Sequence, residues 1–284
     1  MKRRDFIQTM GAAAAGTAFI PSLSSLRIPP TKKLQRIGLE LYAVRRAMSK
    51  DPEGTLAQVR AAGYTDVELL WSFNNFGRST AQVVAALKQN GLRAPSAHIS
   101  PAILFIGWQR SLDTAKAIGH DYLVVPDFGD TVKTLDDWKE WADHFNAAGA
   151  VARKSGIWLA FHNEADHMKP LDASGQVPYD VFINRLDPTV TRLQLDTGNM
   201  LIGGGDPMQY LTKYKDRYWL FHLKDAVADR SSDTRLGKGI FDFKKFLAAV
   251  PDLDQKPCYV EDESPADEME AARNNCQYLQ TLEF

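Results

Sequence analysis

The chain has little of several features that would place it in a well-defined class. It has only two cysteines in 284 residues, Cys258 and Cys276, which excludes a disulfide framework and argues against a thiolate metal site. We expect both to be buried or free. The formal net charge is −1, which gives no electrostatic case for nucleic-acid binding. There is no glycine-rich phosphate loop, and past the N-terminus no run is apolar enough to span a bilayer.

The N-terminus has the order of features found in an export signal. Arg3 and Arg4 are followed by a polar residue and Phe6, then by a mildly apolar run from Met10 to Ile20 that ends at Pro21. Paired arginines in this setting resemble a twin-arginine signal. We expect residues 1–31 to be signal and linker, and residues 32–284 to be one folded domain in an exported, periplasmic protein. The alternative is a basic N-terminus on a cytoplasmic protein.

Short apolar runs alternate with amphipathic helical stretches along the rest of the chain, which predicts a parallel sheet with helices between its strands. The eight expected strands are Arg36–Leu41, Asp66–Leu70, Ala94–Ile99, Tyr122–Val125, Ile157–His162, Thr191–Asp196, Tyr218–Leu223 and Lys256–Glu261. The expected helices are Thr55–Ala62, Thr80–Gln89, Gln109–Ile118, Leu135–Lys154, Tyr179–Leu186, Pro207–Leu211, Asp242–Ala249 and Ala266–Thr281.

Glycines mark where these helices stop. Gly63, Gly91, Gly119 and Gly156 each follow a helical stretch and precede an apolar strand, as expected of residues that end a helix in the left-handed conformation. The longest loops follow the fifth and seventh strands, on the face where barrel active sites form. Eight strand–helix units without a Gly-x-Gly-x-x-Gly turn favour a single-domain (βα)₈ TIM barrel over an open doubly wound sheet.

Polar residues gather at the carboxyl ends of the expected strands, where a closed barrel brings them to one mouth. The second and third strands carry Glu68 and His98, and the last four end in His, Asp or Glu. A buried polar side chain is costly unless it is paired or bound to a metal. Imidazole and carboxylate ligands suit Mn²⁺, Co²⁺, Zn²⁺, Mg²⁺ or Fe²⁺. The sequence therefore predicts a divalent metal at the mouth, near which Lys224 would have a lowered pKa.

Five segments together resemble the xylose isomerase-like TIM-barrel superfamily, in its branch of sugar phosphate isomerases and epimerases. They are Phe161-His162-Asn163, Asp196-Thr197-Gly198-Asn199, His222-Leu223-Lys224-Asp225, Leu236-Gly237-Lys238-Gly239 and Val260-Glu261. The resemblance implies metal ligands from strands five to eight, which here are His162 or Glu164, then Asp196, His222 and Glu261. Many members of this branch read His-Asn-His after strand five, where this chain reads His-Asn-Glu. The choice between His162 and Glu164 is therefore open.

The chemistry expected of such a site is proton transfer next to a carbonyl. A divalent ion that chelates a hydroxyl and an adjacent carbonyl stabilises the enediolate left when a base removes the neighbouring proton. Glu261, Lys224 and Glu164 are the expected catalytic residues. Aromatic and polar residues would bind a sugar, and the candidates are Glu68, Trp71, His98, Trp108, Asn199 and Arg235. Trp71 and Trp108 could instead pack within loops, and Glu68 and His98 could be structural.

Three functions remain as alternatives to an isomerase or epimerase that acts on a keto or hydroxy sugar. The first is a lyase or hydratase acting on 3-keto sugars or glycosides, which export favours because sugar phosphates are scarce outside the cytoplasm. The second is a barrel-type nuclease, which the neutral charge disfavours. The third is a non-catalytic periplasmic sugar-binding protein. The expected partner is a small sugar or glycoside, with neither nucleic acid nor an integral membrane span, and oligomerisation is left open.

Overall fold

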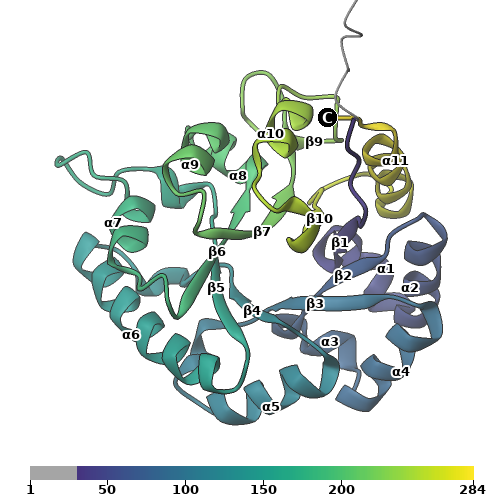
Figure 1. Cartoon of the computed structure of the whole chain (residues 1–284), viewed down its shortest axis with the longest axis horizontal. Helices are drawn as coiled ribbons and strands as arrows, with labels where there is room; N and C mark the ends of the chain where they lie inside the picture. Colours follow the sequence, from purple (N-terminus) through teal and green to yellow (C-terminus); the bar gives the residue numbers. More distant parts are fainter. Residues whose placement is uncertain (1–30) are drawn as a thin grey trace, which may run out of the picture. The chain divides into compact units, whose positions relative to one another are not determined.

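The computed structural model describes residues 31–284, which form a closed barrel of eight parallel strands surrounded by helices (Figure 1). Neighbouring strands pair in sequence order, and β1 closes the ring against β10 with Gly38 opposite Tyr259. The eight barrel strands are β1 Gly38–Glu40, β2 Asp66–Leu70, β3 Arg93–His98, β4 Tyr122–Val125, β5 Trp158–His162, β6 Thr191–Asp196, β7 Tyr218–Leu223 and β10 Cys258–Val260. The predicted TIM barrel is confirmed, and each expected strand overlaps an observed one.

The eight expected helices are also present, with ends that differ by a few residues at most. They are α2 Pro52–Ala61, α4 Thr80–Asn90, α5 Trp108–Ile118, α6 Leu135–Lys154, α7 Pro178–Arg185, α9 Pro207–Lys213, α10 Phe243–Ala249 and α11 Glu268–Thr281. Gly63, Gly91, Gly119 and Gly156 have φ values of 110°, 61°, 96° and 81°, so each takes the left-handed conformation expected of a helix stop. These turns place the next strand at the lower face of the barrel.

The structure adds short elements that the sequence pattern did not predict. They are α1 Arg45–Lys50, α3 Asn74–Gly77, α8 Thr197–Ile202, the hairpin of β8 Asp225–Ala226 and β9 Asp233–Thr234, and the 3-10 turns η1 Leu41–Val44, η2 Trp71–Phe73, η3 Pro101–Leu104, η4 Gly129–Thr131, η5 Asp166–Met168 and η6 Leu253–Gln255. Single-turn helices follow each of the first five strands, and α8 follows β6 directly. They cover the carboxyl ends of the strands. The sequence pattern did not predict them because such short segments are too short to show helical periodicity.

Two loops after strands are held by specific side chains. Asp196, the last residue of β6, caps α8 by accepting a hydrogen bond from the Asn199 N–H at 2.6 Å. Asp225 accepts hydrogen bonds from the backbone N–H groups of Gly237, Gly239 and Phe241, each at 3.0 Å. The glycine turn after β7 is thus tied back to the end of that strand, which gives the mouth of the barrel a fixed wall.

The interior below the mouth is apolar and closely packed. The barrel strands and the inner faces of the helices form one core, with a smaller cluster of Tyr122, Val124, Ala160, Leu220 and Tyr259 inside the barrel. Cys258 and Cys276 are free and buried, as expected. Among residues 31–284, no helix combines the length and apolar character needed to cross a membrane. The expected export signal lies outside the described residues.

Candidate active site

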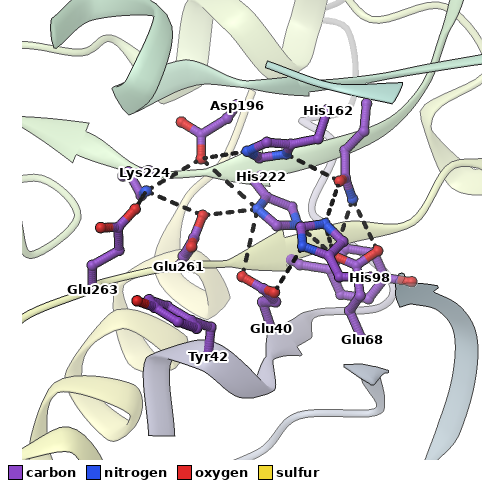
Figure 2. A network of polar contacts seen from close by, with 12 residues as sticks. Glu40, Tyr42, Glu68, His98, His162, Asp196, His222, Lys224, Glu261 and Glu263 are labelled. Carbon is purple, nitrogen blue, oxygen red and sulfur yellow. Dashed lines mark hydrogen bonds and ion pairs between the residues drawn. The ribbon is translucent and has the colours of Figure 1, made fainter. Parts of the chain in front are cut away.

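Seven ionisable side chains meet inside the carboxyl end of the barrel (Figure 2). They come from six barrel strands and from the residue after β10, namely Glu40, Glu68, His98, His162, Asp196, His222 and Glu261. All seven are at most 6% exposed. Parallel strands that end at the same level bring residues far apart in sequence into contact, so the convergence expected from the strand ends is observed. Such a concentration of buried charge is stable only if the groups pair with one another or bind a cation.

Four of these residues form a group suited to one metal ion. One ligand atom each from His162, Asp196, His222 and Glu261 lies within 4.8 Å of the others. Nε2 of His162 is 4.0 Å from Oδ2 of Asp196, and Nδ1 of His222 is 3.8 Å from the same oxygen. Oδ2 of Asp196 is buried with no hydrogen-bond partner, and burial raises the pKa of this carboxyl to about 8. A divalent cation would satisfy this oxygen, so the residues fit the predicted metal.

Gln194 sets the orientation of His162. Its amide nitrogen donates to both oxygens of Glu68, at 3.0 and 3.1 Å, so its Oε1 faces the imidazoles. That oxygen accepts a hydrogen bond from Nδ1 of His162 at 3.1 Å, which leaves the lone pair of Nε2 directed toward Asp196. Burial, followed by repulsion from the neighbouring imidazoles, lowers the pKa of His162 well below its ordinary value. A neutral imidazole oriented by an amide is the form that ligates metals.

His222 lies between two carboxylates. Nε2 contacts Oε2 of Glu68, and Nδ1 lies 2.8 Å from Oε2 of Glu261. Burial acts to lower the pKa of His222, but these two carboxylates outweigh it and raise the pKa well above its ordinary value. Without a cation, the imidazole therefore bridges the two acids as a double donor. With a cation in the group, Glu68 alone would hold Nε2–H, and Nδ1 would be free to ligate.

The structure places His162, rather than Glu164, in the buried group. Oε1 of Glu164 is 3.7 Å from Nε2 of His162, but its side chain is 35% exposed and its other oxygen accepts a hydrogen bond from Asn199 at 2.8 Å. Partial burial raises the pKa of Glu164 well above its ordinary value. Glu164 thus lies between the ligand group and solvent, a position from which a carboxyl can exchange protons with a substrate.

Lys224 is fully buried among acids. Its Nζ is 3.2 Å from Glu261, 3.5 Å from Asp196 and in contact with Glu263. Burial acts to lower the pKa of Lys224, but the surrounding carboxylates raise it well above its ordinary value. The lowered pKa expected from the sequence applies to the metal-bound protein and stays a prediction. Gly198 makes room for this lysine, since a Cβ there would lie 2.3 Å from its Cγ.

A cavity of about 280 Å³ opens beside the ligand group. Its walls contain the carboxylates of Glu40, Glu164, Glu261 and Glu263 together with Tyr42, Leu70, Ser72, Phe73, His98 and Pro126. The cavity is therefore acidic on one side and apolar on the other, and it is large enough for a small polyol.

Three predicted sugar contacts lie away from this cavity. Trp108 belongs to the core, where its Nε1–H donates to the Ala148 carbonyl at 3.0 Å, so it packs α5 against α6 instead of binding a sugar. Arg235 is exposed and lies 3.2 Å from Glu270 on α11. Trp71 packs against the core, and its ring centroid is 5.7 Å from that of His120. His98, Glu68 and Asn199 do lie in the site, although only His98 lines the cavity.

Sequence reasoning missed three residues of the site. Glu40 ends β1 and contacts His98, with Oε1 at 3.2 Å from Nδ1. Gln194 holds two imidazoles and Glu68, and Tyr42 lines the cavity. Glu40 and Gln194 could have been found by the pattern that identified the other residues, a polar side chain within an apolar strand. Gln194 also lies on the same strand face as Asp196. Tyr42 had no signal because an aromatic residue after a strand is ordinary.

Comparison with known proteins identifies the family. The sequence pattern of the xylose isomerase-like TIM barrel family matches residues 56–282, and the chain belongs to this family. Curated relatives include inosose dehydratases. That of Salmonella typhimurium is 30% identical over 129 residues, covering 45% of this chain and 40% of the relative. That of Geobacillus thermodenitrificans is 23% identical over 237 residues, covering 70% and 77%. The chain thus spans about two fifths of the length of the Salmonella relative.

Two solved structures share the fold. A sugar phosphate isomerase/epimerase from Parabacteroides distasonis has a TM-score of 0.74 and 22% identity, covering 88% of this chain and 94% of its own. An IOLI protein with a bound zinc atom has a TM-score of 0.65 and 13% identity, covering 85% and 95%. At these identities the likeness supports the architecture, and the chemistry rests on the residues of the site.

Proposed function

We propose that the chain is a divalent-metal-dependent enzyme that isomerises or epimerises a keto or hydroxy sugar through an enediolate. The observation that carries this proposal is the buried group of His162, Asp196, His222 and Glu261, in which Oδ2 of Asp196 has no hydrogen-bond partner. The family and the zinc atom in the IOLI neighbour support a metal there. The mixed imidazole and carboxylate donors fit Mn²⁺, Co²⁺, Zn²⁺ or Mg²⁺.

A bound divalent ion would polarise the carbonyl of the substrate and offset negative charge on its oxygens. The side chains of the site supply the proton transfer. Glu261 and Glu164 both line the cavity, and Lys224, together with His222, lowers the pKa of Glu261 against the effect of burial. Glu261 is therefore held ionised and ready to take a proton, whereas the raised pKa of Glu164 favours its protonated form. One carboxylate and one carboxylic acid beside the same substrate can remove and return a proton.

A second candidate function is elimination. The inosose dehydratase relatives favour it, because loss of a β-oxygen from the same enediolate gives a dehydratase or lyase instead of an isomerase. In that case Glu164, as the protonated acid of the pair, would deliver its proton to the leaving oxygen. The substrate could then be an inosose, a 3-keto sugar or a 3-keto glycoside.

Metal analysis tests the first part of the proposal. The purified chain, stripped and then reloaded, should bind one divalent ion, and His162→Gln should lower this occupancy sharply. His120→Gln is the matched control because His120 is also buried but lies outside the ligand group. Equal metal occupancy in the two variants would rule out the assigned ligand set.

Reactions in deuterated water separate the two functions. With keto sugars and 3-keto glycosides as substrates, deuterium on a retained carbon without loss of a group indicates isomerisation or epimerisation. Release of water, an alcohol or a free sugar indicates elimination. A metal-loaded chain that gives neither product with these substrates would favour the remaining alternative, a non-catalytic sugar-binding protein.

We also propose that the protein is exported to the periplasm by a twin-arginine signal. The support is the sequence alone, from Arg3 and Arg4 to Pro21. Fusion of residues 1–31 to a reporter that is active only after export in a folded state tests this. Replacement of both arginines by lysine should retain the reporter in the cytoplasm, and unchanged export of that variant would contradict the proposal.

A further inference from the structure

The amino-terminal end of the barrel, opposite the metal site, is closed by aromatic rings and cations. Trp158 is the first residue of β5, Arg192 the second of β6 and Trp219 the second of β7. Both indoles pack against the small apolar cluster inside the barrel. The guanidinium carbon of Arg192 lies 3.5 Å from the ring centroid of Trp158 and 4.8 Å from that of Trp219. Both rings are therefore within the range of a cation–π contact with Arg192.

Two further cations lie on the same two rings. Arg153, near the end of α6, has its guanidinium carbon 3.5 Å from the ring centroid of Trp158. Nζ of Lys256, which precedes β10, lies 5.2 Å from the ring centroid of Trp219. Within residues 31–284, no carboxylate oxygen lies within 4.0 Å of a charged nitrogen of Arg153, Arg192 or Lys256. Three cations thus share this end of the barrel without an ion pair.

Two nearly buried donors at this end have no hydrogen-bond partner. Lys256 is 7% exposed, and Tyr122, the first residue of β4, is 8% exposed. Neither the Lys256 ammonium nor the Tyr122 hydroxyl donates to any residue of the described chain. Arg192 influences the pKa of both side chains, so the three groups lie near one another. Because buried donors are ordinarily paired, this combination indicates a ligand that accepts hydrogen bonds.

The electrostatics favour an anion as that ligand. Burial, to which repulsion from Arg153 adds, lowers the pKa of Arg192 to about 10, so this side chain is still a cation at neutral pH. Burial also lowers the pKa of Lys256, although Asp252 and Asp216 act to raise it. Both cations are therefore less stable here than in water, and a bound anion would offset that cost.

We infer that Tyr122, Arg192 and Lys256 form a binding site for a tetrahedral oxyanion of the phosphate class. Phenol, guanidinium and ammonium groups all donate hydrogen bonds to such an ion. The three come from β4, from β6 and from the turn before β10, so they reach a ligand from different directions, which fits the four oxygens of a tetrahedral ion better than the two of a carboxylate. Four residues of β6 separate Arg192 from Asp196, about 13 Å, so the site is distinct from the metal site.

The indole N–H signals of Trp158 and Trp219 in NMR spectra of the metal-loaded full chain report binding at this end. Trp158→Phe and Trp219→Phe assign the two signals. Titration with inorganic phosphate should move both, beyond the effect of chloride at the same ionic strength, and should leave the signal of Trp108 in place. Lys256→Met and Arg192→Met should each weaken phosphate binding about tenfold or more, the loss expected for a hydrogen bond to a charged group.

A matched control tests whether any cation on an aromatic ring would behave in the same way. Lys213 lies 4.7 Å from the ring centroid of Tyr214 but is paired with Asp180 at 3.4 Å, so Lys213→Met should leave phosphate binding unchanged. Should Arg192→Met not fold, Lys256→Met decides the matter. Glycerol phosphate, compared with inorganic phosphate, shows whether the site prefers a phosphorylated small molecule or the free ion, and either preference supports it.

Three results would overturn the oxyanion site. They are indole signals that move no further with phosphate than with chloride, acetate that binds as tightly as phosphate, and unchanged phosphate affinity in both Lys256→Met and Arg192→Met. The proposed metal site is tested independently, because His162→Gln should lose metal and still bind phosphate at Trp158 and Trp219.

Discussion

Glu68 and His222 form a fully buried contact in which Nε2 of the imidazole donates to Oε2 of the carboxylate. The contact fixes the ring so that Nδ1 faces Asp196 and Glu261. Ser96 donates to the other oxygen of Glu68 at 2.6 Å, so the carboxylate is itself held in place. A histidine oriented in this way by a carboxylate is pre-arranged to bind a metal through its second nitrogen.

Replacement of Glu68 should therefore weaken metal binding although Glu68 is not a ligand. Glu68→Gln keeps the shape of the side chain, but its amide is a weaker acceptor for Nε2–H, and we expect the metal affinity to fall roughly 10- to 100-fold. Titration of the stripped protein with Zn²⁺ or Mn²⁺ measures this, with Glu140→Gln as the control. Unchanged affinity would show that the position of His222 does not depend on Glu68.

The contribution of Lys224 to the stability of the fold should be largest when no metal is bound. Lys224→Met leaves Asp196 and Glu261 buried without their cation, and loss of one partner from such a group costs about 3 to 5 kcal/mol. We expect the metal-free variant to unfold at a clearly lower temperature and a divalent ion to restore part of the loss. Lys213→Met is the control, because Lys213 pairs with Asp180 at the surface and should shift stability by less than about 0.5 kcal/mol.

Most of the barrel could be predicted because its signals are local. An apolar strand, a glycine helix stop such as Gly91 and a capped helix start are all properties of neighbouring residues. Thr134, for example, caps α6 with Asp137 in a reciprocal pair, as its position before Leu135 indicated. The short α8 was missed because a six-residue helix holds too little periodicity, and its cap, Asp196, was already assigned to the metal.

The candidate site could be predicted only as a set of residues, because the partners are distant in sequence. Nothing near Lys224 in the sequence shows that Glu263, 39 positions away, will contact its Nζ and help raise its pKa. The choice of His162 over Glu164 as the metal ligand likewise depends on Gln194. Gln194 accepts a hydrogen bond from Nδ1 of His162 and so leaves Nε2 free to ligate. Trp108 is of a residue type that often binds sugars. Only the packing of α5 on α6 shows that its indole is in the core.

Trp108 provides a test of that last distinction. Trp108→Phe removes the indole N–H and leaves the Ala148 carbonyl buried without its donor, which should destabilise the fold by about 1 to 3 kcal/mol. Because Trp108 does not line the cavity, metal occupancy and sugar affinity should not change. Denaturant unfolding measures the change in stability. Metal analysis and saturation-transfer NMR measure the metal occupancy and the sugar affinity. A variant with normal stability but weaker sugar binding would show that Trp108 contributes to the sugar-binding site.

His120 should make the stability of the fold depend on pH. Its Nδ1 donates to the Ala94 carbonyl at 2.6 Å, and its Nε2 is buried without a partner. Burial lowers the pKa of His120 from the ordinary 6.5 to about 4. The unfolded chain therefore takes up a proton at a higher pH than the folded chain does. The contribution of the neutral imidazole is complete above pH 6.5 and is lost as the pH falls from 6.5 toward 4.

The pKa shift of His120 sets the size of the loss in the free energy of unfolding, which is about 3 kcal/mol between pH 6.5 and 4. His120→Gln removes the titrating group and keeps a donor for Ala94, so its free energy of unfolding should fall less steeply between pH 6.5 and 4 than that of the parent chain. His144→Gln is the control for the loss of a histidine from the surface, because His144 is exposed on α6. Urea unfolding of stripped protein at several pH values gives the slopes, and parallel curves for His120→Gln and the parent would show that the buried imidazole is not what titrates.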